Sequence, residues 1–574
     1  MAKSPVFWPA ILSGLLLWTA YFPLNLGPVA YFAFVPFLTL VRAGGIGSKR
    51  RYFAAYLGGV VFYGISLNWI RVAHPMMAMF AWPGLALYCA LYWPLTVYLL
   101  RKLDRWNLPL AATFPVVTVA MEYCRCHFPT GFGFLAPLHL HQLIGFGWYF
   151  LGYTQHAVLP LIQVADLGGV YLVSAAVAAV NGAVYEWAVR FNPIRKLLGR
   201  STEWRQAQYY REFWVTGLSL LPLGLGIIYG TFRMTHPPFQ RGPVVAAIQG
   251  SLGQDDKDLR YDPASPDGLT PLEREYVPLA VRALGSGATR QPDLIVWPET
   301  CYPYDWWQVA PNGVNVPDVF EHNSRVGPEN MAKRMRFQWK ATTLFGLNAH
   351  VWEGGGPRKY NSAVLTHSDG RFGGRYDKVH LVPFGEYVPL REFFPWLQKL
   401  TPYEHDYSCT PGSEWTRFEF TAASGKPYKF GVLICYEDSD PYPARRYNSW
   451  GGGEGVDFLV NISNDGWFDG TEEHEQHLAI CRFRAIEARR SVVRSVNMGI
   501  SAVIDPDGRV VETPQPGPWS DSKKVRGIVR AEVPIDTRGT VYAALGDWFA
   551  LLCWAVLAAG LFWRKREPSP APAA

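Results

Sequence analysis

Three residues that could break and form acyl bonds each lie at the end of a strand-like run. Glu299 follows LIVWP, Lys378 follows RYD and opens KVHLVPFG, and Cys435 follows KFGVLI. A cysteine thiolate is a strong nucleophile, a carboxylate can accept its proton, and a fixed ammonium group can stabilise an oxyanion. If the fold brings them together, these three residues predict acyl transfer through a thioester.

Each of these residues alone is more often structural than catalytic. A lone cysteine is usually an inert side chain, and a single Glu or Lys is usually a surface charge. Their shared position favours function, because sites in α/β folds form where strands end. A sharp turn into a helix would also place backbone N–H groups near the sulfur of Cys435. We therefore expect a lowered pKa for Cys435 and, through burial, a raised pKa for Glu299.

The elements that must position these residues lie in the middle of the chain, at 241–547. Strand-like runs rich in Val, Ile, Phe and Tyr recur there, among them VVAAIQG, DLIVWPE, NSAVLTH, KFGVLIC and VDFLVNIS. Helical patterns such as LEREYVPLAVRAL lie between them. This mixture predicts an α/β domain with both sheet faces largely covered.

The remaining segments are unusually apolar. Charged residues make up 18% of the chain, whereas a soluble protein has about a quarter. Apolar runs of about 16 to 25 residues match a bilayer core of roughly 30 Å. We predict about eight membrane spans, at residues 6–23, 26–41, 53–70, 77–100, 108–121, 158–187, 214–229 and 548–563.

Positive charges orient these spans. Lys and Arg gather after the second, fourth, sixth and eighth spans, and the opposite short loops hold little beyond Arg71 and Arg125. The positive-inside rule then places the middle domain outside the cytoplasm, in the periplasm of a bacterium with two membranes. We expect a multi-pass protein of the bacterial inner membrane. Because much of the net charge of +7 lies in these short loops, nucleic acid is not an expected partner.

Two features near the fifth and sixth spans have open interpretations. The segment 127–155 is rich in Gly, His and aromatic residues, which favours an interfacial loop over a flap above a lipid-binding mouth. Asp166 lies close to apolar sequence. It either caps a helix at the interface or, as the alternative, is a buried functional acid.

Cysteines and histidines give no metal motif. The chain has eight cysteines and no CxxC pair, and Cys124-Arg-Cys126 is too tight for a usual zinc knuckle. The spacing is not that of a disulfide framework, although a bond between Cys301 and Cys409 stays open. His474 and His477 share a predicted helix without a clear carboxylate partner, which favours a structural role. We expect no metal and no cofactor.

The three strand-end residues resemble the carbon-nitrogen hydrolase (nitrilase) superfamily, which places a Glu, a Lys and a Cys after successive strands. WPE supplies Glu299, YDKVHLVPFGEYVP supplies Lys378, and LICYED supplies Cys435. The HLVPFGEYVP run, the NISNDGWF run at 461–468 and the eight spans resemble the membrane-embedded branch, the apolipoprotein N-acyltransferases. The resemblance covers nearly the whole chain.

This resemblance implies a polytopic α-helical membrane domain of about eight spans plus an α/β domain of the nitrilase-like α-β-β-α sandwich type. The implied boundaries are a seven-span transmembrane domain at 1–240, a periplasmic nitrilase-like catalytic domain at 241–546, a C-terminal transmembrane helix at 547–564 and a cytoplasmic tail at 565–574. The composition of that tail, PSPAPAA, predicts disorder.

The resemblance also implies roles for individual residues. Cys435 would be the nucleophile, Glu299 the general base and Lys378 the oxyanion stabiliser. Glu386 matches a second acid that supports them, and three further residues match family positions around the site: Tyr436, Glu437 and Trp467. One departure is visible, because the family often has a tryptophan soon after the QG of its first strand and 249–262 has none.

The implied reaction moves a fatty acyl chain from a phospholipid, through a cysteine thioester, to the N-terminal α-amino group of a diacylglyceryl-cysteine lipoprotein. This is the last step of lipoprotein maturation, and it makes phospholipid, diacylglyceryl-modified lipoproteins and the lipid bilayer the expected partners. A membrane-anchored carbon-nitrogen hydrolase or amidase that releases a free acid is the alternative enzyme. A transporter or receptor with an inert domain is a third interpretation, against which the spans offer few charged residues for an ion path.

Overall fold

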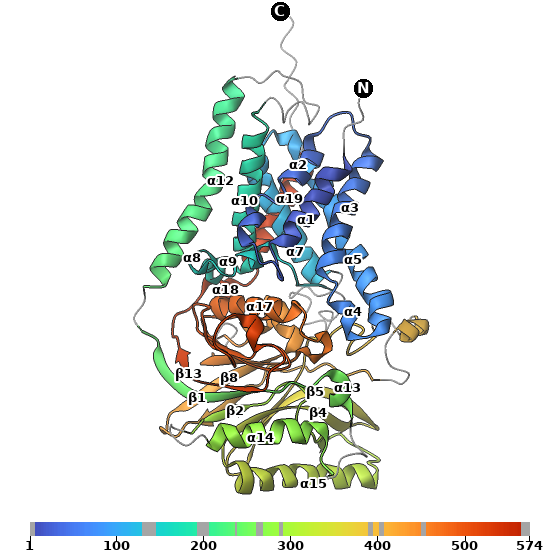
Figure 1. Ribbon diagram of the computed structural model, residues 1–574, viewed down its shortest axis with the longest axis vertical. Helices are drawn as coiled ribbons and strands as arrows, with labels where there is room; N and C mark the ends of the chain where they lie inside the picture. The colour runs from blue at the N-terminus through green and yellow to red at the C-terminus, as the bar shows by residue number, and fades with distance from the viewer. Residues whose placement is uncertain are drawn as a thin grey trace, which may run out of the picture.

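A helical bundle lies at one end of an elongated molecule, and the strands with their own helices lie at the other (Figure 1). The computed structural model describes residues 6–128, 145–191, 206–235, 238–259, 268–285, 291–388, 394–400, 407–448 and 455–563. The predicted tail at 565–574 lies outside these residues. In Figure 1 the helical bundle forms the upper half, and the sheets with their own helices form the lower half.

The bundle is built from the N-terminal part of the chain and one C-terminal helix. Small residues let its helices approach closely, as where a Cβ on Gly14 of α1 would lie 2.5 Å from the Gly58 carbonyl oxygen of α3. The bundle contains α1 (Phe7–Thr19), η1 (Gly27–Tyr31), α2 (Val35–Arg42), α3 (Ser48–Ser66), α4 (Ile70–Ala73), η2 (Met77–Ala81), α5 (Trp82–Ala90), α6 (Tyr92–Leu103), η3 (Asp104–Trp106), α7 (Leu110–His127), η5 (Leu151–Gln155), α8 (Leu159–Ile162), α9 (Ala165–Gly168), α10 (Val170–Ala188), α12 (Gln206–Arg233) and α19 (Trp548–Phe562).

Eight complete spans are not confirmed. Among the described residues, two helical segments are long and apolar enough to cross a bilayer, Met77–Trp106 and Val170–Ala188. Shorter apolar helices fall in other predicted ranges, including Phe7–Thr19 and Trp548–Phe562. The prediction of one continuous span at 158–187 is wrong, because Gly169 has a left-handed φ of 68° and separates α9 from α10.

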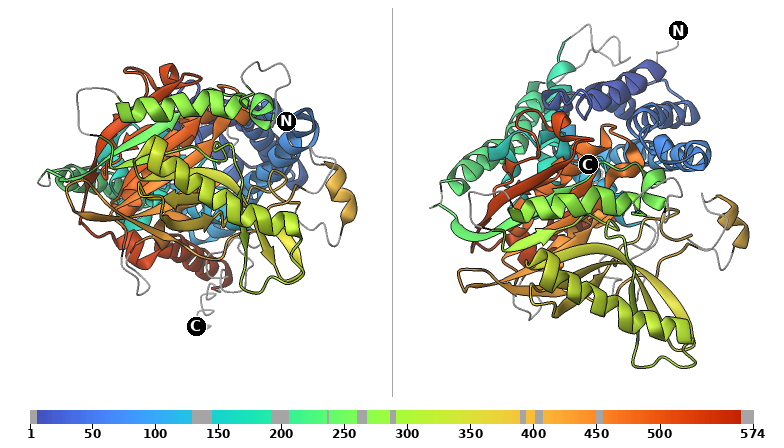
Figure 2. Two further views of the ribbon diagram at one scale, coloured as in Figure 1. Left: turned by 90° about the horizontal axis from the view of Figure 1, so that it is seen from below. Right: turned by 60° about the horizontal axis from the view of Figure 1, so that its bottom comes forward.

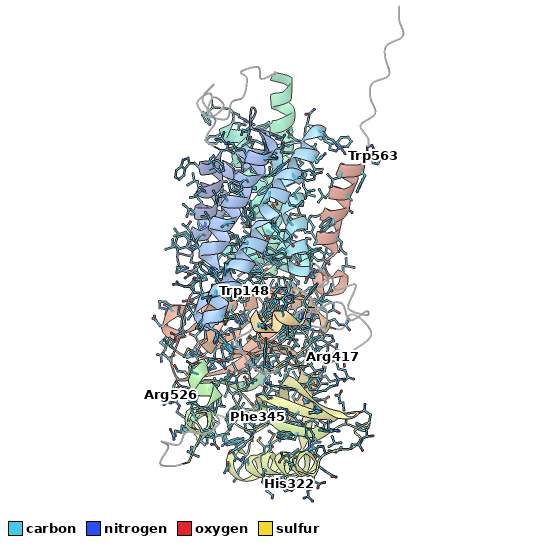
Figure 3. All side chains as sticks on the ribbon, turned by 90° about the vertical axis from the view of Figure 1, so that its right-hand side faces the viewer. Trp148, His322, Phe345, Arg417, Arg526 and Trp563 are labelled. Carbon is cyan, nitrogen blue, oxygen red and sulfur yellow. The ribbon has the colours of Figure 1, made fainter. Side chains whose placement is uncertain are left out.

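Basic residues of the bundle gather at the end that lies away from the sheets. Figure 3 places Trp563, just after α19, at this end. Arg105 donates to the carbonyls of Gly560 and Leu561 at 2.7 and 2.6 Å. Arg42, at the end of α2, pairs at 2.7 Å with Asp104 and with Glu186. The arginines that follow the second and fourth predicted spans therefore lie at one end of the bundle, opposite the sheets.

The lower half contains two mixed sheets. The seven-stranded sheet has the order β13-β1-β2-β4-β5-β6, with β3 paired to β4, and the six-stranded sheet has the order β12-β11-β10-β9-β8-β7. The strands are β1 (Gln240–Gln249), β2 (Leu294–Val296), β3 (Trp306–Val309), β4 (Thr343–Glu353), β5 (Gly356–Thr366), β6 (Phe372–Asp377), β7 (Arg417–Thr421), β8 (Pro427–Ile434), β9 (Phe458–Asn464), β10 (Ser491–Asn497), β11 (Ala502–Ile504), β12 (Val510–Glu512) and β13 (Gly527–Ile535).

The central strands of each sheet are parallel, as their continuous apolar runs require. Val245 of β1 pairs with Leu294 of β2, and Phe430 of β8 pairs with Phe458 of β9. Such strands are buried on both faces, so they read as unbroken runs of Val, Ile, Leu and Phe. Side chains then alternate between two different cores.

These cores define an α-β-β-α sandwich. Val245 and Phe430 lie in the core between the sheets, whereas the next residue of β1, Ala246, packs with helices on the outer face. Figure 2 shows the helices α14 (Pro271–Gly285) and α15 (Asp318–Arg334) on the face turned away from the bundle. The remaining helices and turns of this half are α13 (Gln254–Asp258), η6 (Met335–Trp339), η7 (Pro395–Leu400), η8 (Cys435–Ser439), α16 (Pro441–Arg446), η9 (Asp465–Phe468), α17 (Glu473–Ala488), η10 (Trp519–Ser522) and α18 (Val541–Leu545).

Helix α17 joins the two halves, and every one of its 16 residues is buried. Phe483 and Ile486 belong to the core of the bundle, while Leu478 and Cys481 pack on the six-stranded sheet. Trp148, which Figure 3 places at the boundary, donates to Gln476 Oε1 at 2.9 Å. A helix that is buried all round is typical of the interior of a larger assembly, here the junction of membrane and catalytic parts.

The two features with open interpretations lie at this junction. Residues 129–144 of the segment 127–155 lie outside the described residues, and 146–155 are buried rather than forming an interfacial loop. Asp166 is buried and does not cap a helix at the interface. It accepts from Arg489 at 2.8 Å, Arg233 at 2.9 Å and Tyr229 at 2.8 Å. Since Arg489 directly follows α17, Asp166 fixes the bundle to the sandwich.

Candidate active site

The three predicted residues lie where their strands end. Glu299 lies three residues after β2, Lys378 directly follows β6, and Cys435 directly follows β8. The strands β2 and β6 belong to the seven-stranded sheet, and β8 belongs to the six-stranded sheet. The site therefore lies at one end of the sandwich, where the two facing sheets bring their strand ends together.

Lys378 is held between two carboxylates. Its Nζ lies 3.3 Å from Glu299 Oε1 and 2.9 Å from Glu386 Oε2, and its side chain is buried. Burial alone would lower the pKa of this ammonium group, but Glu299 and Glu386 raise it well above its usual value. Lys378 is thus a permanent cation, as an oxyanion stabiliser needs to be.

Glu299 has a fixed orientation. Its Oε1 accepts from Asn361 Nδ2 at 2.7 Å, and its Oε2 accepts from the backbone N–H of Asn464 at 2.9 Å. Asn361 also donates to Glu386 at 2.8 Å. Lys257 donates to the backbone carbonyl of Glu299 at 3.1 Å. Three neighbours therefore fix Glu299, and one of them, Asn361, also binds its partner acid Glu386.

The turn that carries Cys435 has an unusual backbone. Cys435 adopts a left-handed φ of 51° at the start of η8, a conformation that costs a non-glycine residue about 1–3 kcal/mol and is concentrated at functional sites. Glu437 holds it in place, accepting from Ile434 N at 2.7 Å and from Val379 N and Tyr376 Oη at 2.8 Å each. One buried carboxylate thus ties the Cys435 turn to the segment of Lys378.

The expected pKa shifts of the nucleophile and base are wrong in sign. Burial, with the nearby Glu299 charge, raises the pKa of Cys435 to about 12, although Lys378 opposes this change. Burial favours neutral Glu299, but Lys378 and Lys257 outweigh it and lower the pKa of that carboxyl. The physical reason is that burial outweighs Lys378 in setting the pKa of Cys435, whereas two lysines outweigh burial in setting the pKa of Glu299.

This charge balance constrains how the thiol can react. The resting site holds a neutral thiol beside an ionised Glu299, and a free thiolate would be repelled by that carboxylate. This arrangement can pass the proton of Cys435 to Glu299 when the sulfur attacks a carbonyl, and Lys378 can stabilise the oxyanion that forms.

The supporting residues face the bundle. The Tyr436 hydroxyl donates to the carbonyl of Gly145 at 3.0 Å. Trp467 is half-buried in η9, and its neighbour Phe468 makes an edge contact with Trp69 of the bundle at 4.8 Å between ring centroids. The turns that carry Cys435 and Trp467 therefore both contact the membrane part.

The sequence analysis did not predict Asn361, Asn464 or Lys257 as site residues. Only Asn464 lies in a run that had been singled out, NISND. Nothing in the sequence marks Asn361, which reaches the site because its carbonyl pairs with Lys378 N at 2.8 Å across two adjacent strands. Which residues pair across two strands depends on the register of the sheet, and the sequence of one strand does not determine that register.

The disulfide that the sequence left open is absent. All eight cysteines are free thiols. Cys301 instead donates to the carbonyl of Glu299 at 3.2 Å, and the backbone N–H of Cys409 donates to the carbonyl of Glu386 at 2.8 Å. Both cysteines thus flank the acids of the site without joining one another.

Carboxylates surround His477, although we expected no clear carboxylate partner for it. Its Nε2 lies 2.8 Å from Asp438, and its Nδ1 lies 3.3 Å from both Asp465 and Glu473. Arg494 pairs with Asp465 at 2.8 Å. Burial and Arg494 act to lower the pKa of His477, but Asp438 and Asp465 outweigh them and raise it. Asp465, Glu473 and His477 converge closely enough to hold a metal ion, but His477 and Arg494 already pair with these carboxylates.

His477 links two catalytic turns. Asp438 belongs to η8, which begins with Cys435, and Asp465 follows Asn464, whose N–H holds Glu299. We expect His477→Gln to slow acyl-enzyme formation about 100-fold, because a small misplacement of the nucleophile relative to its base costs that much. Single-turnover acylation rates with thermal unfolding as a second readout would test this.

His474→Gln is the matched control for that experiment. His474 lies one turn earlier on α17 and accepts from the backbone N–H of Gly470 at 2.9 Å, away from Asp438. Equal losses of acylation in the two variants, in step with their loss of stability, would show that His477 has only a structural role.

Comparisons with known proteins agree with these features. Residues 13–183 match the family described as apolipoprotein N-acyltransferase N-terminal domain, and residues 246–542 match carbon-nitrogen hydrolase. The apolipoprotein N-acyltransferase of Geobacter metallireducens is 31% identical over 97% of this chain and 95% of its own length. The chain belongs to the apolipoprotein N-acyltransferase family.

The apolipoprotein N-acyltransferase of Rhodopirellula baltica is 26% identical over 96% of each chain. A crystal structure of a carbon-nitrogen hydrolase from Helicobacter pylori is similar with a TM-score of 0.34 and 15% identity, covering 55% of this chain and 94% of that chain. The fold assignment rests on the family match and the two sheets, since the match to carbon-nitrogen hydrolase runs from β1 to α18. The C-terminal part of this apolipoprotein N-acyltransferase family member thus has the nitrilase-like fold, and its N-terminal part is helical.

Proposed function

We propose that this chain transfers a fatty acyl chain from a phospholipid to the N-terminal α-amino group of diacylglyceryl-cysteine lipoproteins, with Cys435 as the carrier. One observation supports this most strongly. A cysteine on a strained strand-end turn lies beside a buried Glu–Lys–Glu cluster, in a chain of the apolipoprotein N-acyltransferase family.

In the first half-reaction the sulfur of Cys435 attacks the ester carbonyl of the phospholipid, and its proton passes to Glu299. Lys378 and backbone N–H groups stabilise the tetrahedral oxyanion. When the intermediate collapses, the carbon–oxygen ester bond breaks and Glu299 protonates the departing alkoxide. A lysophospholipid leaves, and the acyl chain stays on Cys435 as a thioester.

In the second half-reaction the α-amino group of the lipoprotein attacks the thioester. Glu299 accepts a proton from the amine, an amide bond forms, and the carbon–sulfur bond breaks to return the thiol of Cys435. An α-amine has a pKa of about 7.7–8, against about 10.4 for a lysine side chain. At neutral pH the α-amine is therefore the better nucleophile.

Both substrates are lipids, so the site is best placed at the membrane surface. Each methylene moved into water costs about 0.8 kcal/mol, so removing a two-chain lipid with about thirty methylenes would cost over about 20 kcal/mol. The contacts of Tyr436 and Phe468 with the bundle support a site that receives lipid directly from the bilayer. The bundle would then deliver substrate in addition to anchoring the enzyme.

The product formed from the thioester distinguishes acyl transfer from hydrolysis. Full-length enzyme in mixed micelles would receive phospholipid with a labelled acyl chain and a diacylglyceryl-cysteine peptide. We expect the label on the peptide N-terminus and little free fatty acid. Free fatty acid as the main product, at the same rate with or without peptide, would instead support a membrane-anchored carbon-nitrogen hydrolase.

The proposed topology has seven spans in 1–240, the catalytic domain at 241–546 in the periplasm, and an eighth span at 547–564. The arginines at the end of the bundle away from the sheets support a cytoplasmic location for that end. We expect a cysteine at Val319, exposed on α15, to react with a membrane-impermeant maleimide in spheroplasts.

A cysteine at Leu108 is the control, because the carbonyl of Leu108 binds Arg42 at the basic end. It should react only after the membrane is permeabilised, with labelled positions identified by peptide mass. Labelling of the Leu108→Cys variant but not of Val319→Cys in intact spheroplasts would reverse the topology.

A further inference from the structure

A short helix, α13, binds the turn that carries Glu299. This helix follows β1, and its last turn holds Lys257, whose side chain is buried. The Nζ atom of Lys257 donates to the backbone carbonyl of Glu299 at 3.1 Å and to the hydroxyl of Thr300 at 2.6 Å. One lysine therefore contacts both the proposed general base and the residue that follows it.

The turn that Lys257 binds has a strained backbone. Thr300 has a left-handed φ of 48°, which is a rare conformation for a β-branched residue and costs about 1–3 kcal/mol. The carbonyl of Glu299 also accepts from the Cys301 thiol at 3.2 Å. A strained residue keeps its conformation only when its surroundings hold it. The two hydrogen bonds from Lys257 are part of that restraint, so they help to set the direction of the Glu299 side chain.

The same helix also contacts a residue that binds the Glu299 carboxylate. Gln254, at the start of α13, accepts from Asn464 Nδ2 at 2.7 Å. The backbone N–H of Asn464 donates to Glu299 Oε2 at 2.9 Å. Helix α13 is therefore connected to Glu299 twice, directly at its backbone and through Asn464 at its carboxylate.

Lys257 adds a second positive charge near Glu299. Both hydrogen-bond acceptors of Lys257 are uncharged oxygen atoms, so neither bond neutralises the ammonium group. Burial acts to raise the pKa of Glu299, but the charges of Lys378 and Lys257 outweigh it and lower that pKa. Lys378 also pairs with Glu386 at 2.9 Å, whereas the hydrogen bonds of Lys257 are confined to the Glu299 turn.

We propose that Lys257 is a positioning residue for acyl transfer, which holds the turn of Glu299 and Thr300 in place and keeps the Glu299 carboxylate charged. The proposal rests on the proposed function, in which Glu299 accepts the proton of Cys435. A general base must be both ionised and within reach of the proton that it accepts. Loss of position lowers the rate at every pH, whereas loss of charge moves the acid limb of the pH–rate profile to higher pH.

The other groups around Glu299 do not produce the second effect. Burial raises the pKa of the Cys301 thiol and raises that of Cys435 to about 12, so both thiols stay neutral in acid. Glu386 is a further acid in the cluster, so the titration has to be assigned to Glu299 by a spectroscopic control. A substitution at Lys257 leaves four other titratable groups around Glu299 in the chain: Lys378, Glu386, Cys301 and Cys435.

A burst experiment measures rate and pH dependence together. Full-length enzyme in detergent would receive a nitrophenyl ester of a fatty acid, and nitrophenol in quenched samples would report acylation without phospholipid or lipoprotein. We expect Lys257→Met to lower the burst rate at neutral pH about 10–100-fold and to raise the acid limb by about one pH unit or more. Lys257→Arg, which keeps the charge and the donors, should restore the limb and most of the rate. Lys333→Met, exposed on α15, is the matched control and should behave as the wild type.

Infrared titration gives a second measurement that needs no activity. The carboxyl band that is absent from Glu299→Gln identifies protonated Glu299, and we expect it to appear at higher pH in Lys257→Met than in the wild type. If circular dichroism shows that Lys257→Met is unfolded, Lys257→Gln, which keeps a donor without the charge, replaces it with the same expected shift.

A wild-type acid limb together with a wild-type infrared titration in the folded charge-free variant would overturn the role of Lys257. The proposed function fails separately, if the wild type forms the acyl-enzyme but passes no acyl chain to a diacylglyceryl-cysteine peptide. The burst and the infrared band would still decide the role of Lys257 in that case, because neither measurement uses the peptide.

Discussion

Glu299→Gln should reduce acyl-enzyme formation by about 10³-fold or more while the protein stays folded. The amide keeps the size of the side chain but cannot accept the proton of Cys435, and positioned general bases contribute about 10²–10⁴-fold. Burial is the largest cause of the raised pKa of Cys435 and persists in the variant, so we expect no compensating thiolate at neutral pH. Single-turnover release of lysophospholipid is the appropriate measurement.

The pH dependence sharpens this prediction. Lys378 and Lys257 lower the pKa of Glu299 despite its burial, so the base stays ionised throughout the neutral range. Protonation of Glu299 should therefore not limit the wild-type acylation rate between about pH 6 and 8, and it should lower the rate only in acid. Glu353→Gln, at the far end of β4, serves as the control and should leave the rate unchanged. A near-normal rate in Glu299→Gln would remove this residue from its role.

Lys378→Met should abolish turnover and also destabilise the protein. The substitution removes the oxyanion stabiliser, and it leaves the carboxylates of Glu299 and Glu386 buried together without their shared cation. Removing one partner of a buried ion pair typically costs about 3–5 kcal/mol. Thermal unfolding and single-turnover acylation measured on the same samples would separate the two effects.

The pH dependence of the stability loss in Lys378→Met distinguishes a broken ion pair from a simple loss of packing. In the wild type Glu299 has a lowered pKa, so its ion pair stabilises the protein above the unfolded value of about 4.3, and this contribution is lost as pH falls. Without Lys378 the carboxyl pKa should rise, and protonation would relieve the repulsion. The gap in unfolding temperature between wild type and Lys378→Met should therefore narrow from pH 8 to pH 5. A constant gap would contradict the ion-pair explanation.

The sequence was sufficient to predict the positions of the reactive residues. Glu299, Lys378 and Cys435 each end an apolar run, and a run that is buried on both faces has to be a central strand whose end opens onto a site. The same runs predicted an α/β domain, and the resemblance to the nitrilase superfamily implied its two facing sheets. These features are local, so they can be read from neighbouring residues.

The electrostatics of the site could not be predicted in this way. The raised pKa of Cys435 depends on burial beside Glu299, and the lowered pKa of Glu299 depends on Lys378, Lys257 and Asn361. These contacts depend on sheet register and loop conformation. The same holds for His477, whose partner Asp438 lies on another element.

Membrane spans were harder to predict from hydropathy than the sandwich was from its strands. Gly169 separates α9 from α10 within one apolar run, and the short helix α9 contacts α17 and α18 at the junction. Asp166 on α9 binds Arg489 and Arg233. An apolar run therefore reports burial, whether in lipid or in protein.

The most direct test of the central claim is the intact mass of the enzyme after incubation with phospholipid in the absence of lipoprotein. We expect one acyl chain added to the wild type, mapped to the peptide with Cys435, released by hydroxylamine and absent from Cys435→Ala. Addition of a diacylglyceryl-cysteine peptide should discharge the adduct onto the peptide. An acyl adduct that persists in Cys435→Ala, or that maps to another residue, would contradict the account.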